Sequence, residues 1–186
     1  MSCDYSLLKD EQLLSLIDQG QRGAFSELVK RHTTKFYRVA FRMLNTKEDA
    51  EDAVQDCFLK LWATPGMWKK DKGAKFTTWF YRVVINKCQD MLKRKKEKRL
   101  EDGFDITDES DSAEDGIYNN YKARTLEESL GELSDNQKKA IILSFYEYIN
   151  NKEAAKIMGL SLKAFQSLLM RGKKTLKEKL IAKGGM

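Results

Sequence analysis

The chain has 186 residues, of which 41% are hydrophobic and 10% aromatic, and its formal net charge is +6. This composition is sufficient for packed cores and argues against a wholly disordered chain. No run of about 18 apolar residues predicts a transmembrane helix, and the acidic N-terminal stretch lacks the apolar core of a secretory signal. A single proline beside abundant lysine, glutamate, leucine and alanine favours an all-α fold.

Cysteine and histidine residues give no sign of a metal site. Cys3, Cys57 and Cys88 are widely separated, and the one histidine, His32, has no partner at metal-ligand spacing. We therefore expect reduced thiols in a cytosolic protein, with no metal and no cofactor.

Charge is distributed unevenly along the chain. The net charge is −1 over residues 1–65, +9 over 66–99, −6 over 100–124 and +4 over 125–186. Two basic regions on either side of an acidic one indicate two polyanion-binding modules joined by a linker. We place two small helical modules at residues 5–99 and 125–182, and a flexible acidic linker at 100–124.

The N-terminal module begins with two amphipathic helices. Apolar residues recur at three- and four-residue steps from Phe25 to Leu44, and again from Ala50 to Trp62. Thr46 and Asp49 resemble a capping box at the start of the second helix. The other face of that helix is acidic and carries Glu48, Asp49, Glu51, Asp52 and Asp56. The acids suit a binding surface, and equally a solvated face whose charges favour the helix dipole.

A third helix, KFTTWFYRVVINKC, mixes aromatic and basic residues. At about 100° per residue, a core face gathers Phe76, Trp79, Phe80, Val83, Val84 and Met91. The outward face then contains Thr78, Tyr81, Arg82 and Ile85, with Asn86 at its edge. Outward aromatic and cationic groups are suited to stacking unpaired bases and neutralising phosphates. The basic segment KRKKEKR, residues 93–99, adds an attraction to nucleic acid that salt weakens. In the preceding loop, GMWKKDKGAKF, Trp68 is either exposed or tucked into the core.

Residues 100–121 lack apolar periodicity and carry eight acidic residues and no basic one, which predicts a linker without stable helix. Helical signals then return, because Ser134 and Gln137 form a capping-box pair and Asn150 stands ahead of another apolar run.

Residues 151–180 have the spacing of a helix-turn-helix. A short helix ends at Gly159, where a left-handed residue is needed, and Ser161 caps a second helix whose apolar side runs from Phe165 to Leu180. A recognition helix presents its N-terminal turns to the major groove. The candidate DNA contacts are Ser161, Lys163, Gln166, Ser167, Arg171 and Lys174. An ordinary helical hairpin with a basic face is the alternative.

The ordered blocks AFSELVKRH, NTKEDAEDAVQDCFLKLW, FTTWFYRVVINKCQDMLKR and the C-terminal helix-turn-helix resemble those of bacterial extracytoplasmic function (ECF) sigma factors. The most specific part is the pattern F-x-x-W-[LF]-[YF]-R-[IV]-x-x-N. It is matched at Phe76, Trp79, Phe80, Tyr81, Arg82, Val83 and Asn86. The resemblance covers residues 10–99 and 125–180.

The resemblance implies a specificity subunit of RNA polymerase that directs the core enzyme to promoters, helps to melt them and has no catalytic activity or small-molecule substrate of its own. It assigns Asp49, Asp52, Gln55 and Asp56 to the β′ clamp helices. It assigns Trp68, Lys70, Lys72, Lys75, Tyr81, Arg82 and Asn86 to the minus-ten element, and the candidate DNA contacts of the helix-turn-helix to the minus-thirty-five element. It further implies contact with the β flap, and an anti-sigma factor that holds this cytoplasmic protein at the inner membrane.

Two other classes of protein fit parts of the pattern. A two-domain helix-turn-helix regulator acting without core polymerase would need an effector pocket or dimer seam in residues 1–99. An enzyme acting on nucleic acid would need a metal-binding carboxylate cluster or a nucleophile–base pair, and the acids of residues 48–56 occupy a helix start without such a pattern. We therefore expect no enzymatic activity.

Overall fold

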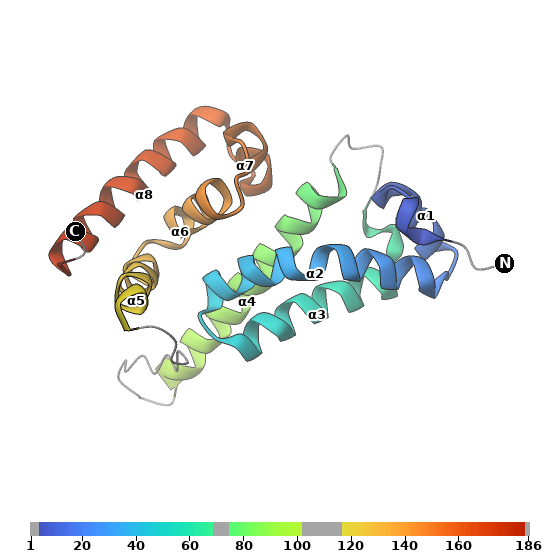
Figure 1. Cartoon of the computed structure of the whole chain (residues 1–186), viewed down its shortest axis with the longest axis horizontal. Helices are drawn as coiled ribbons and strands as arrows, with labels where there is room; N and C mark the ends of the chain where they lie inside the picture. Colours follow the sequence, from blue (N-terminus) through green and yellow to red (C-terminus); the bar gives the residue numbers. More distant parts are fainter. Residues whose placement is uncertain (1–3, 69–74, 102–116, 185–186) are drawn as a thin grey trace. The chain divides into compact units, whose positions relative to one another are not determined.

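The computed structural model describes residues 4–68, 75–101 and 117–184, and every regular element within these ranges is helical (Figure 1). The predicted all-α fold is confirmed. The chain divides into two compact units, Met1–Ile106 (unit 1) and Thr107–Met186 (unit 2). No helix in the described ranges has the length and apolar character needed to cross a membrane.

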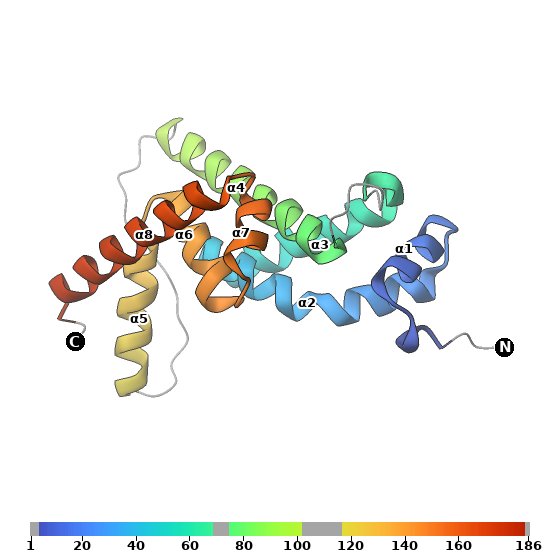
Figure 2. The same cartoon turned by 90° about the horizontal axis from the view of Figure 1, so that it is seen from above.

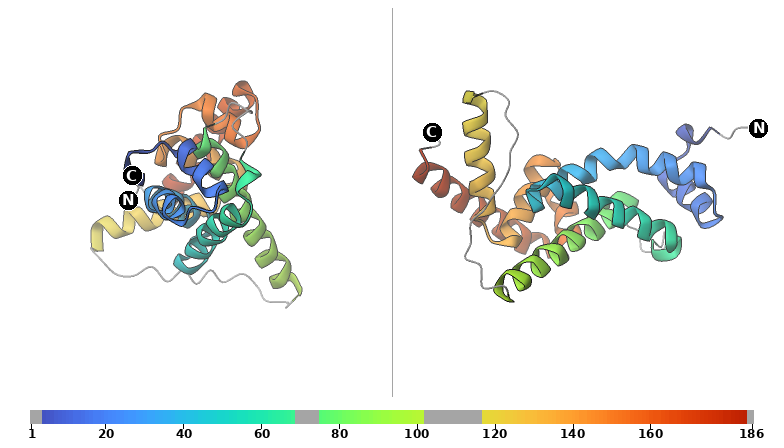
Figure 3. Two further views of the ribbon diagram at one scale, coloured as in Figure 1. Left: turned by 90° about the vertical axis from the view of Figure 1, so that its right-hand side faces the viewer. Right: turned by 90° about the horizontal axis from the view of Figure 1, so that it is seen from below.

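Unit 1 is built around its second helix. Its elements are η1 (Tyr5–Leu7), α1 (Asp10–Asp18), α2 (Arg22–Leu44), α3 (Lys47–Ala63), η2 (Pro65–Met67) and α4 (Phe76–Glu101). α2 contacts α1, α3 and α4, and α3 also packs against α4 (Figures 1 and 3). The three-helix arrangement buries the predicted apolar faces of α2 and α3.

Aromatic side chains from three helices meet at the centre of unit 1. Phe36 of α2 is fully buried, and its ring centroid lies 4.7 Å from that of Phe80, 5.0 Å from that of Tyr81 and 6.5 Å from that of Phe58. Edge-to-face pairs of this kind add about 0.5–1.5 kcal/mol each beyond the burial of their area. The cluster therefore fixes α4 against both α2 and α3.

Arg31 fastens the N-terminal segment to α2. Its guanidinium donates hydrogen bonds to the carbonyl oxygens of Tyr5 at 2.9 Å, Ser6 at 2.8 Å and Leu8 at 2.6 Å, and it also pairs with Glu27 at 2.7 Å. These bonds tie the carbonyl oxygens of η1 and of the following Leu8 to α2, so one side chain holds this turn in place.

Unit 2 contains α5 (Ile117–Gly131), α6 (Asp135–Ile141), the π-helical turn η4 (Ile142–Tyr146), α7 (Asn151–Met158) and α8 (Leu162–Ala182). The prediction of a linker without helix up to residue 121 is wrong at its C-terminal end, because α5 begins at Ile117.

Packing of α5 on α8 explains this helix. Leu130 is buried, and the carboxylates of Glu128 and Glu132 accept hydrogen bonds from Lys183 at 3.2 Å and Lys179 at 2.6 Å. Once the end of a helix is fixed by tertiary contacts, adding further residues to it costs little. Local composition gave no sign of these contacts, which come from residues about fifty positions away.

The predicted helix caps have mixed outcomes. The N–H of Ser134 donates to Gln137 Oε1 at 3.2 Å, and Asn150 Oδ1 accepts from the N–H of Glu153 at 3.0 Å, so both predictions are confirmed. Thr46 makes no side-chain cap; its hydroxyl donates to the carboxylate of Asp49 instead.

Candidate functional site

The acidic face of α3 contains the four predicted polymerase-binding residues. Asp52, Gln55 and Asp56 are exposed, and Asp49 is half-buried. Two of the carboxylates are already paired within unit 1: Lys87 donates to Asp56 at 2.5 Å, and Lys95 donates to Asp49. These ion pairs join α3 to α4, so part of the acidic face also holds the two helices together.

Of the four residues, Asp49 is held most firmly by other residues of unit 1. Its partial burial raises the pKa of the carboxyl, but hydrogen bonds from Lys95 and Thr46 outweigh burial and leave the pKa below its ordinary value. Asp49 is therefore ionised and held by two donors, whereas Asp52 and Gln55 face solvent.

An apolar groove of about 340 Å³ lies between α2 and α3 beside the acidic face. Its lining includes Phe25, Val29 and Tyr37 of α2 and Val54, Gln55 and Leu59 of α3. Leu59 is 52% exposed and belongs to this lining, so part of the apolar groove surface is open to solvent. The acidic face therefore borders an apolar surface, and Gln55 belongs to both.

On α4, the predicted nucleic-acid residues separate into an exposed set and a buried one. Arg82 and Asn86 are exposed, as predicted, and so is Lys75 directly before the helix. The prediction that Tyr81 faces outward is wrong: the residue is 2% exposed, and its ring packs on Phe36. Thr78 and Ile85, also placed outward, are buried as well.

The error has a geometric cause. α4 packs against both α2 and α3, and the buried residues span an arc of roughly 200° at the 3.6-residue helical period. These residues are Phe76, Thr78, Phe80, Tyr81, Val84, Ile85 and Cys88. The prediction at about 100° per residue, a helical wheel with a single apolar face, instead centred the core on one edge of this arc.

The same shift exposes part of the predicted core. Trp79 and Val83 are only half-buried, and at the helical period they lie next to Arg82 and Asn86. Trp79 contacts the rings of Phe76 at 6.0 Å and Phe80 at 5.8 Å between centroids, so one side of its indole is anchored. Trp79 is the functional candidate that the wheel assigned to the core. Its signal was the i, i+3 spacing to Arg82.

Trp68 follows η2 and is half-buried. Its indole N–H is buried, and no described residue accepts a hydrogen bond from it. Trp68 is therefore neither a core residue nor a fully exposed one. Its buried donor without a partner costs free energy. Lys70 and Lys72 lie outside the described residues.

In unit 2, α7, the intervening turn and α8 form the predicted helix-turn-helix. Gly159 has φ of 68°, the left-handed conformation that the sequence predicted, and Ser161 Oγ accepts a hydrogen bond from the N–H of Ala164 at 3.2 Å. The predicted contacts on this surface are all exposed: Ser161, Lys163, Gln166, Ser167, Arg171 and Lys174. Met170 is also exposed, at 67%.

Gly172 explains how α8 lies so close to α6. A Cβ at this position would stand 3.3 Å from Gln137 Cβ and 3.4 Å from Ile141 Cδ1. The residue is buried in the middle of a helix, where glycine otherwise costs about 1 kcal/mol relative to alanine. Close approach of the two helices is what makes a glycine useful there.

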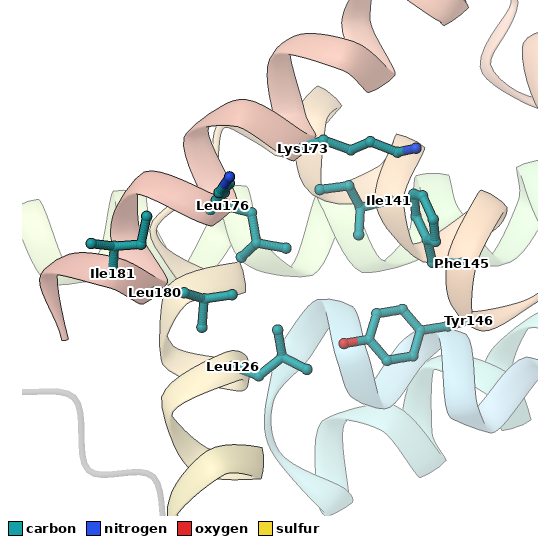
Figure 4. A pocket seen from close by; sticks show the side chains of 9 residues that line it. Leu126, Ile141, Phe145, Tyr146, Lys173, Leu176, Leu180 and Ile181 are labelled. Atoms are coloured by element: carbon teal, nitrogen blue, oxygen red, sulfur yellow. The ribbon is translucent and has the colours of Figure 1, made fainter. Parts of the chain in front are cut away.

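A second apolar groove, of about 480 Å³, lies within unit 2 (Figure 4). Leu126 of α5, Phe145 and Tyr146 of η4, and Leu176 and Ile181 of α8 line it. Lys173 lies at its edge, with Nζ 4.5 Å from the centroid of the Phe145 ring. The groove is thus apolar at its floor and cationic at its rim.

Among the described residues no group of three or more histidine, cysteine, aspartate or glutamate side chains could hold a metal ion. Cys57 and Cys88 are buried free thiols, and burial raises the pKa of Cys57 to about 12, so this thiol is not reactive.

Comparison with known proteins identifies both units. Residues 28–98 match Sigma-70 region 2, and residues 123–176 match Sigma-70, region 4. RNA polymerase sigma factor SigV of Bacillus subtilis is 31% identical over 149 residues, which cover 80% of this chain and 86% of SigV. ECF RNA polymerase sigma factor SigE of Mycolicibacterium smegmatis is 26% identical over 167 residues, and this match covers 88% of the chain but 64% of that longer protein. Among solved structures, the sigma factor RpoE in complex with the anti-sigma factor NepR from Bartonella quintana is similar, with 25% identity and a TM-score of 0.68. The similarity covers 84% of this chain and 96% of that one.

Proposed function

Because the chain belongs to the extracytoplasmic function family of RNA polymerase sigma factors, we propose that it directs core polymerase to specific promoters and helps to melt them. The observation that carries this most directly is the division of α4. One side of the helix forms the core of unit 1, while Arg82 and Asn86 stand exposed beside a half-exposed Trp79.

The acidic face of α3 is the proposed site for the β′ clamp helices. Asp52 and Gln55 are the primary contacts, because they face solvent. Asp56 is 54% exposed at its side chain and can accept a second cation beside Lys87. Asp49 acts mainly through its ion pair with Lys95, which orients the start of α3.

The exposed side of α4 is the proposed site for the minus-ten element. Trp79 provides a ring on which an unpaired base can stack, Asn86 provides an amide that can read a base edge, and Arg82 neutralises a phosphate. Lys70, Lys72 and Lys75 add positive charge before the helix, and Trp68 lies at the start of that loop. Tyr81 supports this surface from inside the core.

The recognition helix α8 is the proposed reader of the minus-thirty-five element. Lys163 and Gln166 lie in its first turns and are placed to contact base edges in the major groove. Ser161, Ser167, Arg171 and Lys174 are suited to phosphates on either side. The apolar groove of unit 2, with its cationic rim, is the proposed site for an apolar segment of the β flap that carries acidic flanks.

The same surfaces make an anti-sigma factor a proposed partner. Both units expose apolar side chains that water solvates poorly, notably Leu59 of α3 and Phe145 of η4. RpoE, a relative of similar structure, was solved in complex with its anti-sigma factor. A partner of this kind would cover the polymerase-binding surfaces until a signal releases the protein.

Run-off transcription with core polymerase from the same bacterium tests the proposal. We expect initiation on a subset of genomic fragments that share two short elements, and only weak binding of the chain alone to those duplexes. If no fragment supports initiation, the proposal is wrong. Tight and selective duplex binding without core polymerase would instead identify a helix-turn-helix regulator.

Substitutions then separate the two DNA surfaces. Arg82→Ala or Asn86→Ala should impair melting and leave binding to the minus-thirty-five element unchanged. Lys163→Ala with Gln166→Ala should show the reverse, with a loss of about 1–3 kcal/mol for each good base contact. Arg94→Ala, exposed on another side of α4 and outside these assignments, is the matched control. If either set leaves its own step unchanged, that residue assignment is wrong.

A further inference from the structure

His32 lies where three helices of unit 1 meet. It belongs to α2, and its Nε2 atom lies 2.8 Å from Oδ2 of Asp10, the first residue of α1. Its ring centroid lies 5.5 Å from that of Phe76, the first residue of α4. In Figure 2, α1 and the first turns of α4 lie along the same half of α2. None of these three residues belongs to the proposed polymerase or DNA surfaces, yet Phe76 begins the helix that carries the proposed minus-ten residues.

The hydrogen bond to Asp10 fixes the plane of the His32 ring. A carboxylate accepts hydrogen bonds and cannot donate them, so Nε2 carries the hydrogen and donates it. The carboxylate is itself held, because Arg31 lies 3.4 Å from its other oxygen and donates to backbone carbonyl oxygens of the N-terminal segment. Only 12% of the His32 side chain is exposed. Rotation of the ring would break the bond to Asp10, so α1 sets the angle at which this ring faces Phe76.

Phe76 connects the His32 ring to Trp79. It is fully buried, and its ring meets that of His32 edge to face, with 60° between the two planes. Its centroid also lies 6.0 Å from that of Trp79, at an angle of 41°. Contacts between aromatic rings depend on orientation, because the positive edge of one ring is attracted to the negative face of the other. The plane of His32 therefore constrains Phe76, and Phe76 in turn constrains Trp79.

We propose that Asp10 and His32 are positioning residues for promoter melting, which hold the Trp79 ring at the angle at which an unpaired base can stack on it. The inference rests on the proposed function, because base stacking on Trp79 is part of that function. Trp79 is half-buried, so its inner contacts with Phe76 and Phe80 set the angle of the side that a base would meet. A binding residue needs such support, since a deviation of about 10–20° is enough to impair a site. Asp10 and His32 act through these rings and not by touching DNA.

Two substitutions break this chain of contacts at different points. Asp10→Asn leaves one side-chain oxygen for two donors, His32 and Arg31, and adds an amide nitrogen that cannot accept a hydrogen bond. His32→Phe keeps an aromatic ring and removes the hydrogen bond that orients it. Tyr5→Phe is the matched control, because it removes a side-chain hydrogen bond of the same N-terminal segment, to Gln21, without altering Asp10 or His32.

Fluorine NMR of the full chain labelled with 5-fluorotryptophan is the first test. The chain has three tryptophans, and substitution of each by phenylalanine assigns their resonances. In Asp10→Asn and in His32→Phe we expect the Trp79 resonance to shift, while that of Trp62 in α3 stays in place. The control variant should move neither resonance. An unmoved Trp79 resonance in the folded variants, or equal shifts of Trp62 and Trp79, would overturn the proposal. This test needs no DNA or polymerase, so its outcome does not depend on the proposed function.

Promoter melting with core polymerase is the second test, read as permanganate reactivity of melted thymines. Asp10→Asn should reduce open-complex formation roughly three- to tenfold, less than Trp79→Ala does, and leave formation of the closed complex unchanged. Combined with Trp79→Ala it should add no further loss, because the effects of residues that act through one another are not additive. An additive loss, or an equal loss for Tyr5→Phe, would overturn the positioning role, since a merely destabilising change would add to that of Trp79→Ala. If the unaltered chain melts no promoter while the Trp79 resonance still shifts, the proposed function fails, and with it the role in melting, while the link from Asp10 to Trp79 stands.

Discussion

The two helices proposed to meet DNA, α4 and α8, are buried to very different extents. α4 buries an arc of roughly 200° between α2 and α3, so that core and exposed residues alternate at neighbouring positions. α8 buries only Phe165, Leu169 and Gly172 among its 21 residues. The polar side of α8 is therefore free to vary, whereas almost every residue in the first half of α4 affects the fold, the DNA surface or both.

This difference indicates at which positions the proposed promoter contacts can change without loss of stability. A new side chain at Lys163 or Gln166 would meet solvent and, in the proposed complex, DNA. A new side chain next to Arg82 meets the aromatic core around Phe36 on one side or the melting surface on the other. The proposed minus-ten surface is thus tied to the stability of its unit, and the proposed minus-thirty-five surface is not.

The largest expected effect comes from Tyr81→Ala. Removing a buried aromatic ring from a packed core costs about 3–5 kcal/mol, so the free energy of unfolding of unit 1 should fall by that amount. All three tryptophans, Trp62, Trp68 and Trp79, lie in unit 1, so their fluorescence reports its urea unfolding specifically. Arg82→Ala, one residue away and exposed, should leave the transition nearly unchanged.

Tyr81→Phe is the matched control, because it keeps the ring and removes only the hydroxyl. A loss below about 1.5 kcal/mol is expected for it. If Tyr81→Ala unfolds like the unaltered chain but fails to melt promoters, Tyr81 belongs to the DNA surface and the division of α4 is wrong.

In α8, the next largest effect is expected at its closest approach to α6. Gly172→Leu forces a side chain against Gln137 and Ile141 and should cost about 1–3 kcal/mol, less whatever leucine gains over glycine in helix propensity. The part of the far-UV circular dichroism transition that tryptophan fluorescence does not follow reports unit 2. Arg171→Leu, at an exposed neighbouring position, should not destabilise the unit, and an equal loss there would point to a general effect on the helix.

The contrast between α4 and α8 also explains what the sequence could and could not predict. For α8, Gly159 and Ser161 mark the turn and the cap by their own backbone chemistry, and these fix which residues of the next helix face outward. Every predicted contact on that helix is exposed. The family blocks added the order of the two units, which the comparisons confirm.

For α4, the helical period gave the element but not its orientation. A helical wheel drawn for one apolar face assumes that the helix packs against a single neighbouring helix. It cannot show that two helices, α2 and α3, cover the stretch from Phe76 to Ile85 from both sides. Tyr81 and Trp79 were therefore exchanged between the core and the surface. The start of α5 was missed for a related reason, since its partners Lys179 and Lys183 are distant in the sequence.

A substitution of Trp79 tests whether this residue, and not Tyr81, belongs to the proposed DNA-binding surface. Trp79→Ala should remove a stacking platform worth about 1–3 kcal/mol and reduce open-complex formation by roughly ten- to a hundredfold, measured as permanganate reactivity of melted thymines. Trp79→Phe keeps a ring and should lose less. Binding to the minus-thirty-five element should be unchanged. Normal melting by a folded Trp79→Ala variant would confine the surface to Arg82 and Asn86.

The smallest expected effect concerns the ion pairs within each unit, and it depends on pH. Hydrogen bonds from Lys179 and Lys183 lower the pKa of Glu132 from its ordinary 4.5 to about 2, while in unit 1 the pKa of Asp49 is lowered against partial burial. A carboxyl with a lowered folded-state pKa stabilises the fold above its unfolded pKa, and this contribution is lost as pH falls through the folded value. The contribution of Glu132 to the free energy of unfolding should therefore be complete at neutral pH and be lost as the pH falls from 4.5 toward 2.

Glu132→Gln should lower the urea midpoint of unit 2 at neutral pH, and the difference from the unaltered chain should vanish at the acidic end of this window. Added salt should shrink the difference at neutral pH, because these side chains are exposed and screened. A difference that persists at low pH would mean that Glu132 stabilises α5 by packing and not through its charge.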